Sequence, residues 1–345
     1  WSPQPPPSLP PPAPGPAVAI SSPPPVVPPA VAAAGKPSVS SQVTLPVVDD
    51  EAGGIVTSDA LAGTWTISLA EVMMGEKLGA GAYGEVRKAL WRGREVAVKV
   101  LHDQSDKSQK MFIHEADLMC KLRHPNIVEC LAACTDPPSL MVVMEFVAGG
   151  SLSSFIKKRG PSEPRISLHI AHGILSGIAY LHNVSPIIIH RDIKPENVLL
   201  TPDLMPKIAD FGVSREKAGT GESMTRIGTP LFCAPELIRG TKYNEVVDIY
   251  SFSLLLYSLV TGKKPFTGYL NEDGSEITPF QVMMRVVNEG LRPIMDEKTN
   301  QPQGIAAFIK SCWDHYPKKR PNAEKGLDML SDLMFQLRQG LPPQP

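Results

Sequence analysis

The sequence predicts an α+β fold with two unequal parts, a small β-rich part followed by a larger and mainly helical part. Up to about residue 144, short runs of β-type residues at 95–101 and 140–146 accompany one helical stretch at about 107–122. From about residue 150 onward, apolar residues recur at spacings of three and four, which is typical of helices. A chain of 345 residues, 42% of them hydrophobic, can bury the core that both parts require.

Proline-rich stretches fill residues 1–48, and an acidic and then glycine-rich linker follows at 49–64. Proline fixes φ and removes a backbone donor, so residues 1–48 are predicted to form an extended, disordered tail. Such a tail could bind an SH3 or WW domain. The only charged side chain before Asp49 is Lys36. SH3 ligands usually carry a flanking basic residue, so a plain spacer is the favoured interpretation.

Composition and charge exclude several classes of protein. The net charge of -1 provides no overall basic field for nucleic acid. No apolar run reaches the roughly 18 residues that a membrane span needs, and the longest, at 249–260, predicts a buried helix. The N-terminus lacks a secretory signal pattern, so we expect a cytoplasmic protein. The chain begins with Trp1 rather than Met, from which we expect a fragment or a processed form.

The five cysteines are scattered along the chain in an odd number, which does not indicate a disulfide framework. A zinc site is not expected either, because Cys130 and Cys134 have no histidine or second cysteine pair nearby. Reduced and mostly buried thiols are therefore expected at all five positions: Cys120, Cys130, Cys134, Cys233 and Cys312.

A glycine-rich motif, LGAGAYGEV, occupies residues 78–86. Glycines allow the backbone to approach phosphate groups closely, with N–H groups facing the oxygens. A dinucleotide-binding turn would be followed by a helix, and a P-loop would need Gly-Lys-Ser/Thr directly after the glycines. Here β-type residues resume at Val86. The motif therefore predicts a strand–turn–strand lid over a nucleotide, formed by Gly79, Gly81 and Gly84.

Lys99 ends the apolar run VAVK, where a cation is costly without an anionic partner. Phosphate oxygens could be that partner, and Glu115, in the predicted helix, could hold the lysine in place. For a lysine and a glutamate considered alone, an ordinary surface pair would be the favoured interpretation.

Three further motifs follow in order: HRDIKPEN at 190–197, DFG at 210–212 and APE at 234–236. Together with the glycine motif and the VAVK run, they resemble the eukaryotic protein kinases over about residues 65–337. The resemblance implies the bilobal protein kinase fold. The expected parts are an N-lobe at 65–144, a hinge at 145–150, a C-lobe at 151–337 and a C-terminal tail at 338–345.

Shorter motifs narrow the resemblance to the tyrosine-kinase-like group, which includes Raf-like, mixed-lineage and MAP-kinase-kinase-kinase-type enzymes. These are WTI at 65–67, WRG at 91–93, CW at 312–313 and RP at 320–321. Lys194, two residues after Asp192, and Thr229 before the APE motif resemble serine/threonine kinases instead of tyrosine kinases. Ser253 and Phe232 depart from the family pattern, which usually has Gly and Tyr or Trp there.

The resemblance implies the catalytic roles. Asp192 would orient the attacking hydroxyl, and Lys194 would meet the γ-phosphate of ATP. Asn197 and Asp210 would hold Mg²⁺, which prefers oxygen ligands. Lys99, held by Glu115, would bind the α- and β-phosphates.

The nucleotide is expected to lie between the two lobes. Leu78 and the three glycines would cover it, and Val86, Ala97 and Leu199 would enclose the adenine. Met144 would be the gatekeeper residue at the back of the pocket. The hinge, whose backbone would meet the edge of the adenine, begins with Glu145, Phe146 and Val147.

Other residues of these motifs are expected to be structural. His190 would pack behind the catalytic loop, and Asp248 would cap the backbone of that loop. A buried ion pair is expected between Glu236 and Arg320. Phe211 and Met119 would belong to an apolar stack between the lobes, and Cys233 is not expected to have a redox role.

A regulatory phosphate is expected between residues 210 and 236, because Arg191 beside the catalytic aspartate needs an anionic partner. Thr225 is the first choice, with Ser223 second and Thr220 third. Thr229 is a poor choice, since its counterpart in the family contacts the catalytic loop. A segment that is ordered without modification remains the alternative.

The sequence thus predicts an ATP- and Mg²⁺-dependent serine/threonine protein kinase that acts on a protein substrate, and we expect it to work in a signalling cascade. The alternative is a catalytically weak pseudokinase or scaffold with a proline-rich interaction tail. Pseudokinases typically lose one of the residues corresponding to Lys99, Asp192 or Asp210, and this chain keeps all three. An active enzyme is therefore the favoured interpretation.

Overall fold

The fold was analysed in a computed structural model of the chain. It describes residues 65–80, 84–103, 105–135, 139–212, 214–216, 230–271, 273–295 and 304–339. The predicted tail and linker, Gly81 and the candidate phosphosites Thr220, Ser223 and Thr225 lie outside the described residues.

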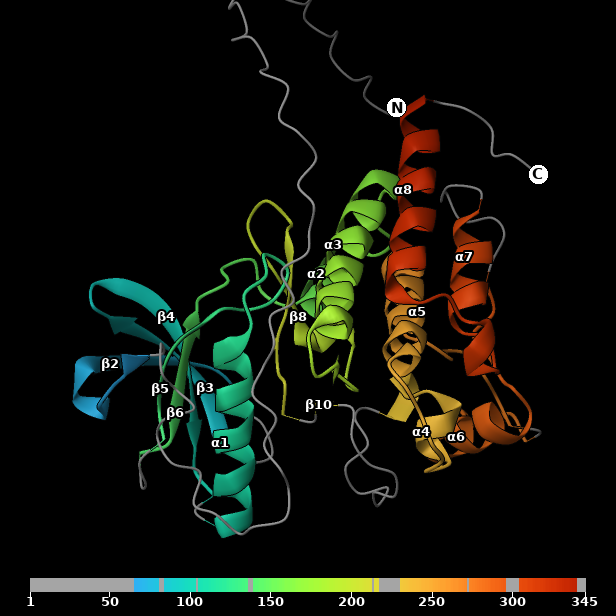
Figure 1. The fold of residues 1–345 in the computed structure, drawn as a ribbon. Coiled ribbons are helices and arrows are strands. Elements are labelled where there is room, and N and C mark those ends of the chain that lie inside the picture. Colours follow the sequence, from blue (N-terminus) through green and yellow to red (C-terminus); the bar gives the residue numbers. More distant parts are fainter. Residues whose placement is uncertain are drawn as a thin grey trace, which may run out of the picture. The chain divides into compact units, whose positions relative to one another are not determined.

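A six-stranded sheet forms the N-lobe, with the strand order β1-β5-β6-β4-β3-β2. Strand β1 pairs in parallel with β5, and the other neighbours are antiparallel. Strands β2 to β6 can be followed in Figure 1. A short 3₁₀ helix, η2 (Leu69–Glu71), precedes β2. The strands are β1 (Trp65–Thr66), β2 (Val72–Ala80), β3 (Gly84–Trp91), β4 (Arg94–Leu101), β5 (Cys130–Cys134) and β6 (Met141–Glu145).

Alternation along β4 gives the sheet two different faces. Val96 and Val98 are fully buried and pack in an apolar cluster on one face. Ala97 and Lys99 lie on the opposite face, because successive side chains of a strand point to opposite sides. Helix α1 (Asp106–Lys121) begins after Ser105, whose side chain accepts a hydrogen bond from the amide of Ser108.

The C-lobe is mainly helical, and its centre is helix α5 (Val246–Thr261), which is buried along its whole length. Helix α3 (Pro164–Asn183) packs against both α5 and α8 (Figure 1). The other helices are α2 (Leu152–Arg159), α4 (Pro235–Ile238), α6 (Pro279–Asn288), α7 (Ile305–Cys312), α8 (Ala323–Gln339), η3 (Pro195–Asn197), η5 (Pro230–Phe232) and η6 (Pro317–Lys319).

Two short two-stranded sheets complete the lobe. Strand β8 (Val198–Leu200) pairs with β9 (Pro206–Ile208), and β7 (Ile188–Ile189) pairs with β10 (Arg215–Glu216). These strands flank the segments that carry the HRDIKPEN and DFG motifs, so they set the positions of those motifs.

The predicted elements are confirmed, with small differences in their ends. The run at 95–101 is β4, the run at 140–146 is β6, and the stretch at 107–122 is α1. The apolar run at 249–260 lies within α5. Helix α8 continues to Gln339, beyond the predicted end of the domain at residue 337. None of the helices that the structure describes is long and apolar enough to cross a membrane.

One pair of the five cysteines departs from the expectation of separate thiols, because the sulfur atoms of Cys120 and Cys130 lie in direct contact. The end of α1 packs against β5, which brings the two Cα atoms within 5.0 Å. The number and spacing of cysteines carry no information about this contact. Cys134, Cys233 and Cys312 are free and buried, as expected.

Candidate active site

A buried carboxylate on α5 holds the loop between β7 and η3 through hydrogen bonds to the backbone of the loop. Asp248 is fully buried, and its two oxygens accept hydrogen bonds from the amides of His190, at 2.9 Å, and Arg191, at 2.8 Å. These bonds hold the loop where Arg191 adopts a φ of 64°, a conformation that non-glycine residues rarely adopt. The expected capping role of Asp248 is confirmed.

His182 on α3 completes this support. Its Nε2 lies 2.9 Å from Oδ2 of Asp248. Burial alone would raise the pKa of Asp248, but the hydrogen bond and charge of His182, together with His190 and the amide of Arg191, outweigh it and lower that pKa. The carboxylate is therefore kept in its charged, hydrogen-bond-accepting form.

Two predicted catalytic residues, Asp192 and Lys194, meet the predicted Mg²⁺ ligand Asn197 next to this support. Lys194 Nζ donates to Asp192 Oδ2 at 2.6 Å, and Asn197 Nδ2 donates to the same oxygen at 2.8 Å. Asn197 also donates to the carbonyl oxygen of Asp192 at 3.0 Å. Asp192 is only 9% exposed, so its carboxylate is held in one orientation by neighbours on its own loop.

A second cluster joins the two lobes. Lys99 Nζ lies 2.6 Å from Glu115 Oε1 and 3.2 Å from Asp210 Oδ1. Burial opposes the charge of Lys99, but the carboxylates of Glu115 and Asp210 outweigh it and raise the pKa of the lysine. The pKa of Asp210 is lowered, since the attraction of Lys99 exceeds the opposing effect of burial. Lys99 is thus a charged side chain held by two carboxylates. The alternative from the sequence was an ordinary pair of Lys99 and Glu115 on the surface.

His190 and Phe211 pack together behind these two clusters. His190 is fully buried, its Nε2 lies 3.2 Å from the carbonyl oxygen of Ala209, and its ring packs on Phe211 at 5.0 Å. Phe211 and Met119 are both buried in one apolar core. These contacts agree with the structural roles expected for all three residues.

The described residues of the glycine-rich motif, 78–80 and 84–86, lie on β2 and β3, the two strands predicted around the turn. A Cβ atom at Gly84 would lie 2.0 Å from the carbonyl oxygen of Val100, so glycine is required there by packing on β4. At Gly79, no described atom lies within 4 Å of the Cβ position. Of these two glycines, only Gly79 therefore has open space where a ligand could approach.

The residues predicted around the adenine come from both lobes. Val86 lies opposite Lys99, and Ala97 lies opposite Met144, so these four share one face of the sheet. Leu199, in β8, is half-buried. Of the remaining predicted residues, Val147 is buried, Phe146 lies 4.7 Å from the ammonium of Lys88, and Leu78 is 45% exposed.

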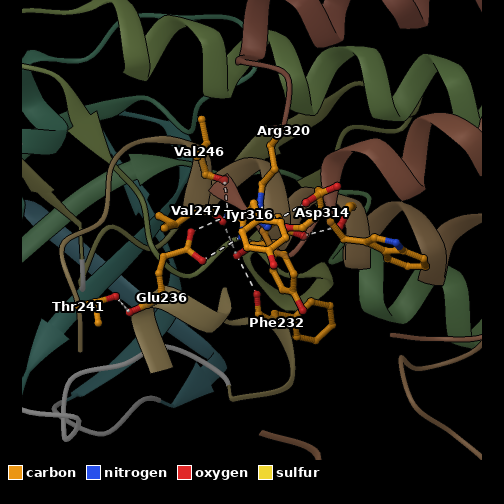
Figure 2. Close-up of polar contacts among 12 residues, drawn as sticks. Phe232, Glu236, Thr241, Val246, Val247, Asp314, Tyr316 and Arg320 are labelled. Atoms are coloured by element: carbon orange, nitrogen blue, oxygen red, sulfur yellow. Dashed lines mark hydrogen bonds and ion pairs between the residues drawn. The ribbon is translucent and has the colours of Figure 1, made fainter. Parts of the chain in front are cut away.

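The expected ion pair of the C-lobe is present. Arg320 donates two hydrogen bonds to the carboxylate of Glu236, at 2.6 and 2.9 Å, and a third to the carbonyl oxygen of Val246 (Figure 2). Both side chains are nearly completely buried. The pair thereby joins helix α4, which carries the APE motif, to the segment before α8.

Two contacts of the site were not predicted from the sequence. Arg191 Nη1 donates to the hydroxyl of Tyr243, at 3.2 Å. Glu145, predicted only as a hinge residue, pairs with Lys207 of β9 at 2.7 Å. The partners are 52 and 62 residues apart, so no local sequence pattern could indicate either contact.

Cys233 lies near the catalytic loop and is buried. Burial raises its pKa to about 12, with a further contribution from the charge of Asp192. A thiol with so high a pKa is a poor nucleophile, because the thiolate is the reactive form. This agrees with the expectation that Cys233 has no redox role.

Comparison with known proteins assigns the chain to a family. The sequence model of the protein kinase domain matches residues 72–330. The serine/threonine-protein kinase CTR1 of Arabidopsis thaliana is 39% identical over 274 residues, covering 78% of this chain and 32% of CTR1. The serine/threonine-protein kinase STY46 of the same plant is 35% identical over 272 residues, covering 78% of this chain and 45% of STY46.

A third relative comes from another organism. The probable serine/threonine-protein kinase drkA of Dictyostelium discoideum is 34% identical over 270 residues, covering 77% of this chain and 40% of drkA. The matched region spans less than half the length of each of these three relatives.

Proposed function

Because the chain belongs to the protein kinase domain family, we propose that it transfers the γ-phosphoryl group of ATP to serine and threonine hydroxyls of protein substrates. Its relatives support the resemblance to the tyrosine-kinase-like group. The observation that carries the proposal is the pair of charge clusters in the site, Lys99 with Glu115 and Asp210, and Asp192 with Lys194. A pseudokinase is not favoured, because these residues are all present and paired.

The proposed cofactors, ATP and Mg²⁺, are supported by the chemistry of the residues. Asn197 donates through Nδ2, so its amide oxygen remains an acceptor, and the side chain of Asp210 is 52% exposed. Both supply the oxygen ligands that Mg²⁺ prefers. Lys99 supplies a fixed cation for the phosphates, and Gly79 leaves the open space that a close approach needs. When bound, Mg²⁺ would neutralise charge on the phosphates and orient them.

The residues of the chain would contribute positioning and proton handling. Asp192 would accept a hydrogen bond from the substrate hydroxyl and take its proton as the new bond forms. Lys194, which now pairs with Asp192, would also face the transferred phosphoryl group and stabilise its charge. Lys99 would hold the α- and β-phosphates, with Glu115 fixing the lysine from behind.

We expect a preference for serine and threonine over tyrosine as the acceptor. The basis is Lys194 at the second position after Asp192, together with Thr229 and the names of the relatives. The measurement is the initial rate on matched peptides that differ only in having Ser, Thr or Tyr at one position. Efficient labelling of the tyrosine peptide alone would overturn the proposal, and labelling of all three would indicate dual specificity.

We also expect activity to depend on a phosphate at Thr225, with Ser223 and Thr220 as second and third choices. A phosphate there would add about 1.5–2 negative charges near Arg191 and order the segment. Phosphatase treatment and Thr225→Ala should each lower the peptide rate, and Arg191→Ala should remove the difference between treated and untreated enzyme. If the dephosphorylated enzyme and Thr225→Ala both match the wild type, phosphorylation at this segment is not the switch.

A further inference from the structure

An ion pair joins the end of β6 to β9, two segments that are far apart in the sequence. Lys207 Nζ lies 2.7 Å from Glu145 Oε1, and the two side chains are only 13% and 16% exposed. Exposed ion pairs contribute little, because water screens them and the side chains lose entropy. In a mostly buried pair, removal of one partner leaves the other charge without compensation. This pair therefore constrains the position of Glu145 more strongly than a surface pair would.

The same carboxylate oxygen also binds the chain before β5. The amide of Glu129 donates to Glu145 Oε1 at 2.9 Å, and the amide of Glu145 donates to the carbonyl oxygen of Glu129 at 3.0 Å. The main chain and side chain of Glu145 are thus both attached to Glu129. Lys207 supplies a charged partner to Glu145 and connects this arrangement to the C-lobe.

Strand β9 is itself tied to the proposed floor of the adenine site. Lys207 lies opposite Leu199 in the β8–β9 pair. The next residue, Ile208, accepts a hydrogen bond from the amide of Val128 at 2.8 Å. Lys207 therefore lies between Leu199, on the proposed floor of the adenine site, and Glu145, the first residue of the hinge. The catalytic carboxylates Asp192 and Asp210 pair with other lysines, at the phosphate end of the site.

We propose that Lys207 is a positioning residue for nucleotide binding, which fixes Glu145 and so the hinge backbone against the strands that enclose the adenine. The inference rests on the proposed function, since it takes the adenine of ATP as the ligand of the hinge. The role concerns the adenine end of the nucleotide, and the phosphates are held by other groups. Loss of Lys207 should therefore weaken nucleotide binding and leave the phosphoryl-transfer step intact.

The test is Lys207→Met in the full chain, which keeps the apolar stem and removes the charge. Dissociation constants are measured by calorimetry for adenosine, for ATP with Mg²⁺, and for inorganic tripolyphosphate. We expect the constants for adenosine and ATP to rise about tenfold, the scale of one lost charge-assisted hydrogen bond. The constant for tripolyphosphate should stay within about twofold. In the peptide assay, KM for ATP should rise about tenfold and kcat should change by less than about twofold.

Three further variants separate this role from general destabilisation. Lys207→Arg keeps the charge and should restore most of the adenosine affinity. Glu145→Gln keeps an acceptor for the Glu129 amide, so it should match Lys207→Met, and the double variant should be no weaker than either alone. Lys121→Met is the control, because it breaks a different ion pair of the same 2.7 Å length, between Lys121 and Asp117 on α1, and should leave adenosine binding unchanged.

Wild-type adenosine affinity in both Lys207→Met and Glu145→Gln would overturn the inference, as would an equal loss for adenosine and tripolyphosphate. Should Lys207→Met fail to fold, Glu145→Gln alone decides between these outcomes. The proposed function can fail separately. If the wild type binds adenosine in a Lys207-dependent way but transfers no phosphate, the proposed function is wrong and the positioning role stands. If the wild type binds neither adenosine nor ATP, both are wrong.

Discussion

Replacing Asp192 with Asn is expected to reduce turnover by about 10²–10⁴-fold, the usual contribution of a general base. Asn has nearly the same size as Asp, so the loop should keep its conformation, supported by Asp248 from below. It lacks the basic, charged oxygen that now accepts hydrogen bonds from Lys194 and Asn197. Because the proposed role of Asp192 concerns the hydroxyl acceptor and not the nucleotide, ATP affinity should change by less than about threefold.

Turnover is measured with a saturating peptide substrate, and ATP affinity is measured separately by calorimetry. The control is Asp273→Asn, which removes the charge of an exposed aspartate in the loop before α6 and should leave both quantities unchanged. Equal turnover for Asp192→Asn and the wild type would exclude Asp192 as the base. A large loss of ATP affinity with unchanged turnover would assign Asp192 to nucleotide binding instead.

Breaking the ion pair between Glu236 and Arg320 is expected to give the largest loss of stability. Arg320→Met should lower the free energy of unfolding by about 3–5 kcal/mol, because Glu236 would remain as a buried charge without its partner. The pair makes two short hydrogen bonds, and both side chains are nearly completely buried. Urea unfolding followed by fluorescence and circular dichroism gives the free-energy difference if both probes agree on one transition.

Two variants test whether the unpaired charge is the cause. The double variant Glu236→Leu with Arg320→Met removes both charges and should be less destabilised than Arg320→Met alone. Arg285→Met removes one partner of an exposed pair, Arg285 with Glu289, and should cost less than about 1 kcal/mol. If Arg320→Met costs no more than Arg285→Met, or the double variant costs more than Arg320→Met, the account of the buried pair is wrong.

The fold and the central site residues could be predicted because their signals are local in the sequence. The alternation of inward- and outward-facing residues around Lys99 predicts strand β4, and the spacing of apolar residues predicts helix α5. The order of the motifs around Asp192 and Asp210 then identified the family and, with it, the pairing of Lys99 with Glu115. The structure adds that Gly84 is required by packing against Val100, which a pattern of glycines cannot distinguish from an approach to phosphate.

What the sequence did not predict depends on contacts between distant segments. Lys207 stands in a short strand with nothing to indicate that it reaches Glu145, 62 residues earlier. The contact between Cys120 and Cys130 depends on how the end of α1 packs on β5, and cysteine spacing cannot reveal this. Each contact is decided by tertiary packing, so it becomes visible only when the segments are assembled.

The most direct measurement is transfer of labelled γ-phosphate from ATP to a degenerate peptide library, with the wild-type chain and Asp192→Asn compared side by side. For the wild type we expect label on serine and threonine, dependent on Mg²⁺. For Asp192→Asn we expect at least about 100-fold less. Absence of label with the wild type, under conditions in which it binds ATP, would contradict the proposed phosphoryl transfer. Equal labelling by both proteins would show that a contaminating enzyme, or a site other than the one around Asp192, transfers the phosphate.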